Sequence, residues 1–87
     1  MSLDQDFEAA AEAIKHISQR PSDEELLELY ALFKQATVGD VNTPRPGMMD
    51  LKGKAKWDFW NKKKGMSKDT AKQQYIAFVD KLIEKYK

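Results

Sequence analysis

The 87-residue chain contains no cysteine. Without cysteine, disulfide bonds cannot hold the fold and thiolates cannot ligate a metal. We therefore expect a protein of a reducing compartment, with the cytoplasm as the simplest assignment. The first residues, MSLDQDFEAA, are acidic and carry no long apolar run, so they do not resemble a secretory signal. No other stretch is apolar and long enough to predict a membrane span.

The sequence is also poor in residues that catalysis uses. Its one histidine, His16, is expected to face away from the apolar stripe of its helix, and we interpret it as an exposed surface residue. The serines fall at the N-terminus or at predicted helix ends, where capping accounts for them. No glycine-rich loop precedes a helix, and no metal-ligand spacing occurs. We predict a protein without catalytic activity, cofactor or bound metal.

Basic residues are in only slight excess, because the formal net charge is +1, but charge is divided unevenly along the chain. Residues 1–33 carry two bases and eight acids, which gives −6. Residues 34–87 carry thirteen bases and six acids, which gives +7. This asymmetry suggests an anionic partner for the second part. Packing of the acidic part beside the basic part would explain it equally well.

Apolar residues recur at spacings of three and four almost throughout the chain, which predicts helices. The first helix is expected from about Asp4 to Ser18, and the proline of the link QRP ends it. The second helix follows Ser22, which forms a capping-box signature with Glu25. Gly39 is expected to end the second helix, because glycine tolerates a left-handed backbone.

Two further helices are predicted in the second half. Asp50 can cap a helix over roughly Leu51 to Lys64, and Ser67 can cap the last one. The segment GDVNTPRPGMMD, with two prolines and two glycines, is expected to be a long loop that is either functional or disordered. We find no strand alternation and no internal repeat. The chain, residues 1–87, is thus predicted to be a single all-α domain, a four-helix bundle.

The stretch LKGKAKWDFW places three lysines beside the only two tryptophans. On a helix, Lys52 and Lys56 share one face because they are four residues apart, whereas Lys54 points elsewhere. We interpret Trp57 and Trp60 as core residues. For the lysine pair, a ligand site and an ordinary solvated surface remain equally open.

The second helix carries a comparable group. Tyr30, Phe33 and Lys34 stand at positions i, i+3 and i+4, so they share a face. Lysines beside large flat side chains suit a ligand that has both phosphate groups and a ring. A binding function is therefore better supported than a catalytic one.

Four segments, LYALFKQATVGD, RPGM, KGKAKWDFWNKKKGMS and QQYIAFVDKL, together resemble the acyl-CoA-binding proteins. The resemblance runs from Phe7 to Tyr86 without an apparent gap, and the combination of KQATVGD, PG and KAKW is specific to that family. It implies a bundle of the up-down-down-up type with a long loop between helices two and three. It also implies a non-enzymatic cytosolic carrier that binds medium- and long-chain fatty acyl-CoA esters and forms a pool of them.

The resemblance further implies which residues contact the ligand. The lysines would hold the phosphates, with Lys15 and Lys52 assisting, and the aromatic residues would hold the adenine. Phe33 stands where the family commonly has tyrosine, so it keeps a ring for stacking but lacks a hydroxyl donor. A groove for the acyl chain is expected at Leu26 and Leu27. The residues expected to bind acyl-CoA are Lys15, Tyr30, Ala31, Leu32, Phe33, Lys34, Lys52, Lys56 and Tyr75.

The main alternative is a non-enzymatic helical module that binds nucleic acid or protein. Nucleic acid would use the basic part of the chain, but such domains usually show a strong overall basic excess. A protein-binding bundle would need an exposed apolar stripe, which the sequence alone does not reveal. Membrane contact is expected to be at most transient, because no predicted helix combines a basic face with a large apolar face. We expect a monomer that docks on enzymes using acyl-CoA.

Overall fold

The computed structural model describes residues 2–87. Within that range the chain forms helices and no strand, which confirms the predicted all-α fold. Each of the four predicted helices is present, and a short 3-10 helix continues the first one. The elements are α1 (Leu3–Ala13), η1 (Ile14–His16), α2 (Asp23–Thr37), α3 (Leu51–Asn61) and α4 (Lys68–Lys85).

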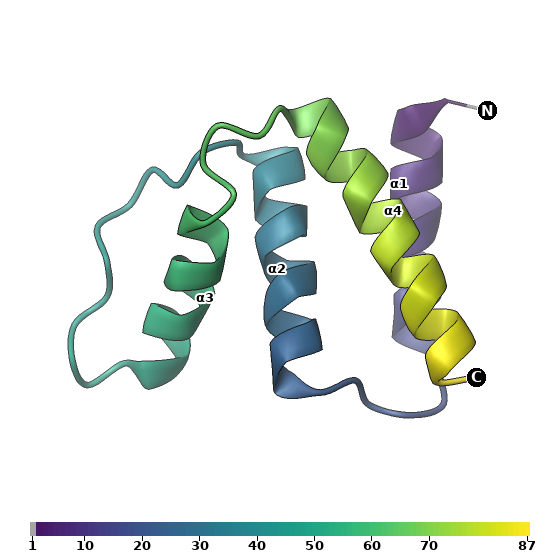
Figure 1. Ribbon diagram of the computed structural model, residues 1–87, viewed down its shortest axis with the longest axis horizontal. Helices are drawn as coiled ribbons and strands as arrows, with labels where there is room; N and C mark the ends of the chain where they lie inside the picture. Colours follow the sequence, from purple (N-terminus) through teal and green to yellow (C-terminus); the bar gives the residue numbers. More distant parts are fainter. Residues whose placement is uncertain (1) are drawn as a thin grey trace.

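The helices lie side by side in the order α3, α2, α4 and α1 (Figure 1). Helix α2 packs against both α3 and α4, α1 packs against α4, and α3 packs against α2 alone. Helices α1 and α4 run in one direction, and α2 and α3 run in the other, which confirms the up-down-down-up arrangement. Because α2 and α3 are parallel, the loop of residues 38–50 must return along the length of the molecule. No described helix is long and apolar enough to cross a bilayer.

The helix starts follow the predicted capping residues. The Ser22 hydroxyl accepts from the Glu25 amide at 3.2 Å, and the Glu25 carboxylate accepts from the Ser22 amide at 2.8 Å. Asp50 accepts from the amide of Gly53, and Ser67 accepts from the amide three residues later. These bonds satisfy amides that have no partner inside their own helices. The predicted positions of the three caps are therefore confirmed.

The predicted end of the first helix is wrong. Regular α-helix stops at Ala13, and after η1 the backbone of Ile17 is extended, with φ −69° and ψ 148°. Ile14 nevertheless packs against the core. The apolar spacing therefore predicted correctly that Ile14 is buried, but not where the α-helix ends. Helix α3 is also shorter than predicted, since it ends at Asn61 and turns lead to Gly65. Gly65 adopts the left-handed backbone expected of a terminating glycine, with φ +91°.

The main core lies between α1, α2 and α4. Helix α3 takes no part in this cluster and contributes a single buried residue, Trp60. This division makes α3 a peripheral element whose position depends on its contacts with α2 and the long loop. The buried core residues are Phe7, Ala10, Leu29, Leu32, Ala36, Ala71, Tyr75, Val79 and Leu82.

The two tryptophans of α3 hold the long loop against the helix. Trp60 is 4% exposed, and its indole N–H donates to the Gly39 carbonyl at 2.8 Å. Trp57 donates to the Thr43 carbonyl at 2.8 Å but is only partly buried. The prediction of a core residue is therefore confirmed for Trp60 and wrong for Trp57, whose indole clamps a loop at the surface.

Two ion pairs add to the attachment of α3. The Arg45 guanidinium donates two hydrogen bonds of 2.9 Å to the Asp58 carboxylate, which joins the loop to the middle of α3. These bonds lower the pKa of Asp58. Lys63 donates to Glu28 at 2.6 Å and ties the residues just after α3 to α2.

A buried amide joins the end of α2 to the segment before α4. Gln35 is 0% exposed, and its side-chain NH₂ donates to Asp40 at 2.9 Å and to the Met66 carbonyl at 2.8 Å. The same Asp40 oxygen accepts from the Gly65 amide at 2.8 Å. The Gly65 and Gln35 bonds lower the pKa of Asp40. This junction ties the segment between the end of α3 and the start of α4 to the end of α2.

Candidate ligand-binding groove

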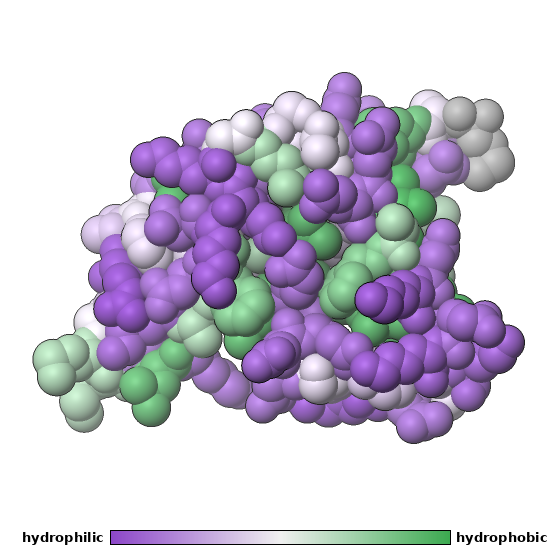
Figure 2. Space-filling model, in the orientation of Figure 1, coloured by the Kyte–Doolittle hydropathy of each residue, from purple (hydrophilic) through white to green (hydrophobic). Residues whose placement is uncertain are grey.

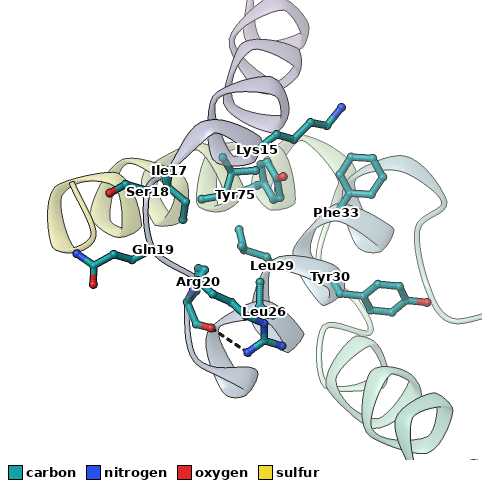
Figure 3. Close-up of a pocket in the computed structure, with 12 residues that line it drawn as sticks. Lys15, Ile17, Ser18, Gln19, Arg20, Leu26, Leu29, Tyr30, Phe33 and Tyr75 are labelled. Carbon is teal, nitrogen blue, oxygen red and sulfur yellow. Dashed lines mark hydrogen bonds between the residues drawn. The ribbon is translucent and has the colours of Figure 1, made fainter.

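Two hollows lie along α2, one on each side. The first, of about 520 Å³, lies between η1, the link that follows it, α2 and α4 (Figure 3). The second, of about 370 Å³, lies between α2 and α3. The two hollows share the lining residues Arg20, Leu26 and Tyr30, so they are neighbours across α2. We refer to the two hollows together as the groove.

Aromatic rings form one wall of the first hollow. Phe33 is 38% exposed and stacks on Phe7, with ring centroids 5.5 Å apart and planes inclined by 26°. Tyr75 lies beside both rings, 5.0 Å from Phe7 and 5.9 Å from Phe33. Burial raises the pKa of the Tyr75 phenol. The exposed part of Phe33 therefore offers flat apolar surface to the hollow, whereas Tyr75, which is 4% exposed, lines the hollow from the core.

Lysines of α3 form the rim of the second hollow. Lys52 and Lys56 line it whereas Lys54 does not, as the helical spacing predicted. The Lys56 ammonium lies over the ring of Tyr30, 5.3 Å from its centroid. Within residues 2–87, neither Lys52 nor Lys56 forms an ion pair, so both charges are available to an anionic ligand.

The floor of the second hollow is apolar. Leu26, Leu27, Leu51 and Ala55 line it from α2 and α3. Leu26 also packs against the main core, whereas Leu27 is half-buried outside it. The groove thus combines an apolar floor, aromatic faces and basic side chains, and it suits a ligand that has a hydrocarbon part, a planar ring and negative charge.

Comparison with known proteins identifies the family. The sequence model described as Acyl CoA binding protein matches residues 4–79. The chain belongs to this family. It is 58% identical over 84 residues to the acyl-CoA-binding protein homolog of Drosophila melanogaster, covering 97% of this chain and 98% of that protein. It is also 58% identical over 80 residues to acyl-CoA-binding protein homolog 1 of Caenorhabditis elegans, covering 92% and 93% of the two chains.

Solved structures of the family share the fold. Acyl-CoA-Binding Protein 2 of Oryza sativa superimposes with a TM-score of 0.91 at 46% identity, over 95% of this chain and 90% of that one. The protein from Moniliophthora perniciosa gives a TM-score of 0.83 at 41% identity, over 99% and 92% of the chains. The resemblance seen in the sequence is thereby confirmed, and so is the predicted four-helix bundle.

Most of the residues predicted from the family resemblance do lie at the groove. Tyr30, Phe33 and Tyr75 line its first hollow together with Lys15. The Lys15 side chain is 68% exposed and lies 3.4 Å from Glu12, whose pKa is lowered by hydrogen bonds from His16 and Lys15. With Lys52, Lys56, Leu26 and Leu27 in the second hollow, the predicted set forms a connected surface.

Three predicted residues stand apart from the groove. Ala31 and Leu32 are 0% and 2% exposed, so their side chains cannot touch a ligand there. The physical reason is helical rotation, which turns the two residues between Tyr30 and Phe33 toward the core. Lys34 does not line the groove either, because its ammonium lies over Trp60, 5.0 Å from the ring centroid.

Arg20 is the main residue that sequence reasoning missed. It lines both hollows from the link between η1 and α2, and it is held by Asp23 at 3.0 Å and by the Pro21 carbonyl at 3.4 Å. The available signal was its position as the sole base of a short link that must cross one end of the groove. Leu51 and Ala55 were also missed, although they share a helix face with the predicted lysines.

The described residues offer little for catalysis at the groove. His16 is exposed and lies 3.2 Å from Glu12 instead of lining either hollow. Among residues 2–87, no group of three or more His, Cys, Asp or Glu side chains could hold a metal ion. What the groove presents is a surface for binding.

Proposed function

We propose that the protein is a cytoplasmic, monomeric carrier that binds medium- and long-chain fatty acyl-CoA esters and keeps a pool of them, without catalysis or a cofactor. The observation that carries the proposal is the groove, in which an apolar floor adjoins a rim of bases and aromatic rings. The names of the relatives from Drosophila melanogaster and Oryza sativa support the same ligand.

The basic rim suits the phosphates of coenzyme A, which has a 3′-phosphate and a pyrophosphate. Lys52 and Lys56 would act as point-charge partners, and Arg20 could donate two parallel hydrogen bonds. Lys15 would assist from the other hollow, and Lys34 would join if its side chain left Trp60. Exposed contacts of this kind contribute about 0–1 kcal/mol each. We therefore expect them to select CoA esters over free fatty acids and to speed encounter.

The aromatic wall suits the adenine ring. Tyr30 and Phe33 present ring surface to the same hollow, which the buried ring of Tyr75 also lines. Stacking of a base on an aromatic side chain contributes about 1–3 kcal/mol. Because Phe33 has no hydroxyl, we propose only stacking for it and no hydrogen bond to the ligand.

The apolar floor suits the acyl chain. Leu26, Leu27 and Leu51 would cover methylene groups, and each covered methylene contributes about 0.8 kcal/mol. A sixteen-carbon tail could therefore contribute up to about 10 kcal/mol if it were fully covered. This exceeds the sum of the exposed ion pairs, so affinity should rise with chain length.

Calorimetric titration tests the proposal with three ligands: palmitoyl-CoA, CoA and palmitate. We expect one-to-one binding of the ester, much weaker binding of CoA and negligible binding of palmitate. Equal affinity for the ester and for CoA would contradict the role of the floor, and absence of ester binding would overturn the proposal. We do not extend the proposal to nucleic acid, because the bases surround an apolar floor and the net charge is only +1.

A further inference from the structure

Two lysine amines share the second hollow with its apolar floor. Lys52 and Lys56 line this hollow together with Leu51 and Ala55, and its described lining includes no imidazole. Figure 2 shows hydrophobic and hydrophilic side chains side by side at the lower left of the molecule, where Figure 1 places the start of α3. Because the chain has no cysteine, no thiol of the protein competes with these amines as a nucleophile. The hollow therefore brings an amine close to any thioester whose hydrocarbon tail it holds.

The thioester of a bound acyl-CoA would lie where the apolar floor meets the basic rim. The carbonyl carbon is the first atom of the acyl chain, so a tail that lies on Leu27 and Leu51 places this carbon at one end of the floor. The pantetheine arm separates the thioester from the phosphates. A lysine that borders the floor is therefore better placed to reach the carbonyl carbon than a lysine that stays on the phosphates.

Lys52 is the better placed of the two amines. The Lys56 ammonium lies over the ring of Tyr30, 5.3 Å from its centroid, and a contact of this kind favours the protonated amine, which is not a nucleophile. Within residues 2–87, no ion pair and no cation–π contact holds the Lys52 ammonium. Lys52 also directly follows Leu51, which lines the floor and is 72% exposed. Its side chain is thus able to leave a phosphate and turn to the floor.

We propose that a bound acyl-CoA acylates Lys52 of its own carrier, an inference that rests on the proposed function. The Lys52 ammonium first loses a proton to water, and the neutral amine then attacks the carbonyl carbon of the thioester. A carbon–nitrogen bond forms and the carbon–sulfur bond breaks, with its electron pair leaving on the sulfur. The CoA thiolate takes up the second proton that the nitrogen loses. The products are a fatty amide on Lys52 and free CoA, so the step is a single self-modification and not a catalytic cycle.

The product of this step blocks the groove. Acylation removes the charge of Lys52 and ties a hydrocarbon chain to a residue that lines the second hollow. The tethered chain competes with every later ester for the floor at Leu26 and Leu27, and tethering gives it a high effective concentration there. The acylated protein should therefore bind palmitoyl-CoA about tenfold or more weakly than the unmodified protein does.

Mapping of palmitoylated lysines by mass spectrometry tests the proposal. Full-length protein is incubated with equimolar palmitoyl-CoA at about pH 8, where more of a lysine amine is neutral than at pH 7. Lys54 is the matched control, because it lies on α3 without an ion pair within residues 2–87 and lines neither hollow. We expect palmitoylation of Lys52 to exceed that of Lys54 about tenfold or more, because binding makes the step at Lys52 intramolecular.

A second ester and two variants control for the intrinsic reactivity of each lysine. Acetyl-CoA has no long tail for the floor to hold, so it should modify Lys52 and Lys54 to a similar, low extent. Lys52→Arg keeps the positive charge but has no primary amine, and it should abolish most of the palmitoylation of the chain. Lys54→Arg should change neither the palmitoylation of Lys52 nor the affinity for palmitoyl-CoA. Equal palmitoylation of Lys52 and Lys54 in the parent protein would overturn the proposal.

Calorimetric titration of the same protein with palmitoyl-CoA separates this proposal from the proposed function. Ester binding without preferential palmitoylation of Lys52 would overturn the self-acylation and leave the carrier function intact. Stronger palmitoylation of Lys56 than of Lys52 would overturn the choice of nucleophile. Absence of ester binding, together with equal modification of Lys52 and Lys54, would overturn both proposals. If purified protein palmitoylated at Lys52 bound palmitoyl-CoA as tightly as the parent does, the tethered chain would not block the groove.

Discussion

Leu27→Ala separates the acyl floor of the groove from its basic rim. Leu27 lines the second hollow, and it is half-buried without belonging to the main core. Its replacement by alanine should therefore change ligand binding with little loss of stability. Leu26 would be a poorer choice, because it packs against the core and its truncation would mix folding with binding.

The expected magnitude follows from the area that the substitution removes. Leucine exceeds alanine by three carbon atoms, which would contribute about 2.4 kcal/mol if a ligand covered them completely. Since most of Leu27 is already buried in the free protein, we expect about a third of this value, roughly 0.8 kcal/mol, which corresponds to about a fourfold loss of affinity for palmitoyl-CoA. Binding of CoA, which has no tail, should remain unchanged.

Isothermal calorimetry of the parent protein and of Leu27→Ala with both ligands measures this difference. Thermal unfolding of the two proteins serves as the control for stability. Equal losses of affinity for palmitoyl-CoA and for CoA would show that Leu27 does not contact the acyl tail. An unchanged affinity for palmitoyl-CoA would contradict the placement of the acyl tail in the second hollow.

Three further predictions concern the rim, the buried junction and the acid dependence of stability. Lys56→Gln should weaken palmitoyl-CoA and CoA alike, by about fivefold at low salt and less at high salt, and a loss confined to the ester would argue against phosphate contact. Gln35→Leu removes the hydrogen bonds of this buried amide to Asp40 and to the Met66 carbonyl and should lower stability by about 2 kcal/mol, or about 10 °C in melting temperature, measured by scanning calorimetry. An unchanged melting temperature would show that the junction contributes nothing. Hydrogen bonds from Lys85 and Tyr86 lower the pKa of Glu25 to about 2. A lowered carboxyl pKa stabilises the fold above the ordinary pKa, and this contribution is lost as pH falls from about 5 toward 2. Urea unfolding across that range should show a shallower loss of stability in Glu25→Gln, and parallel curves for the two proteins would contradict the assignment.

Local features of the fold could be predicted because they depend on residues close together in the sequence. Ser22, Asp50 and Ser67 cap helices by accepting hydrogen bonds from amides three residues away. The starts of these helices could therefore be predicted from local sequence. The backbones of Gly39 and Gly65 are left-handed, with φ +100° and +91°, as terminating glycines require. The helical face shared by the groove lysines followed from spacing in the same way.

Features that depend on distant residues could not be predicted in this way. The indole of Trp57 was expected in the core, but the returning loop offered it a carbonyl at the surface. From the sequence, Arg20 could be recognised only as a single basic residue. Its position at the groove could not be predicted, because the sequence does not show that the link between η1 and α2 borders both hollows. The apolar spacing of Ile14 likewise revealed its burial without revealing that η1 is a 3-10 turn.

Mapping the bound ligand by NMR tests most directly whether the groove binds acyl-CoA. A ¹⁵N–¹H titration with dodecanoyl-CoA should shift the amides of Leu27, Tyr30 and Lys56, which lie around the groove. The amides of Ala9 and Asp80, which lie together in a hollow between α1 and α4 away from the groove, should remain unchanged. Shifts concentrated at Ala9 and Asp80, with none around α2 and α3, would contradict the claim that the groove binds acyl-CoA.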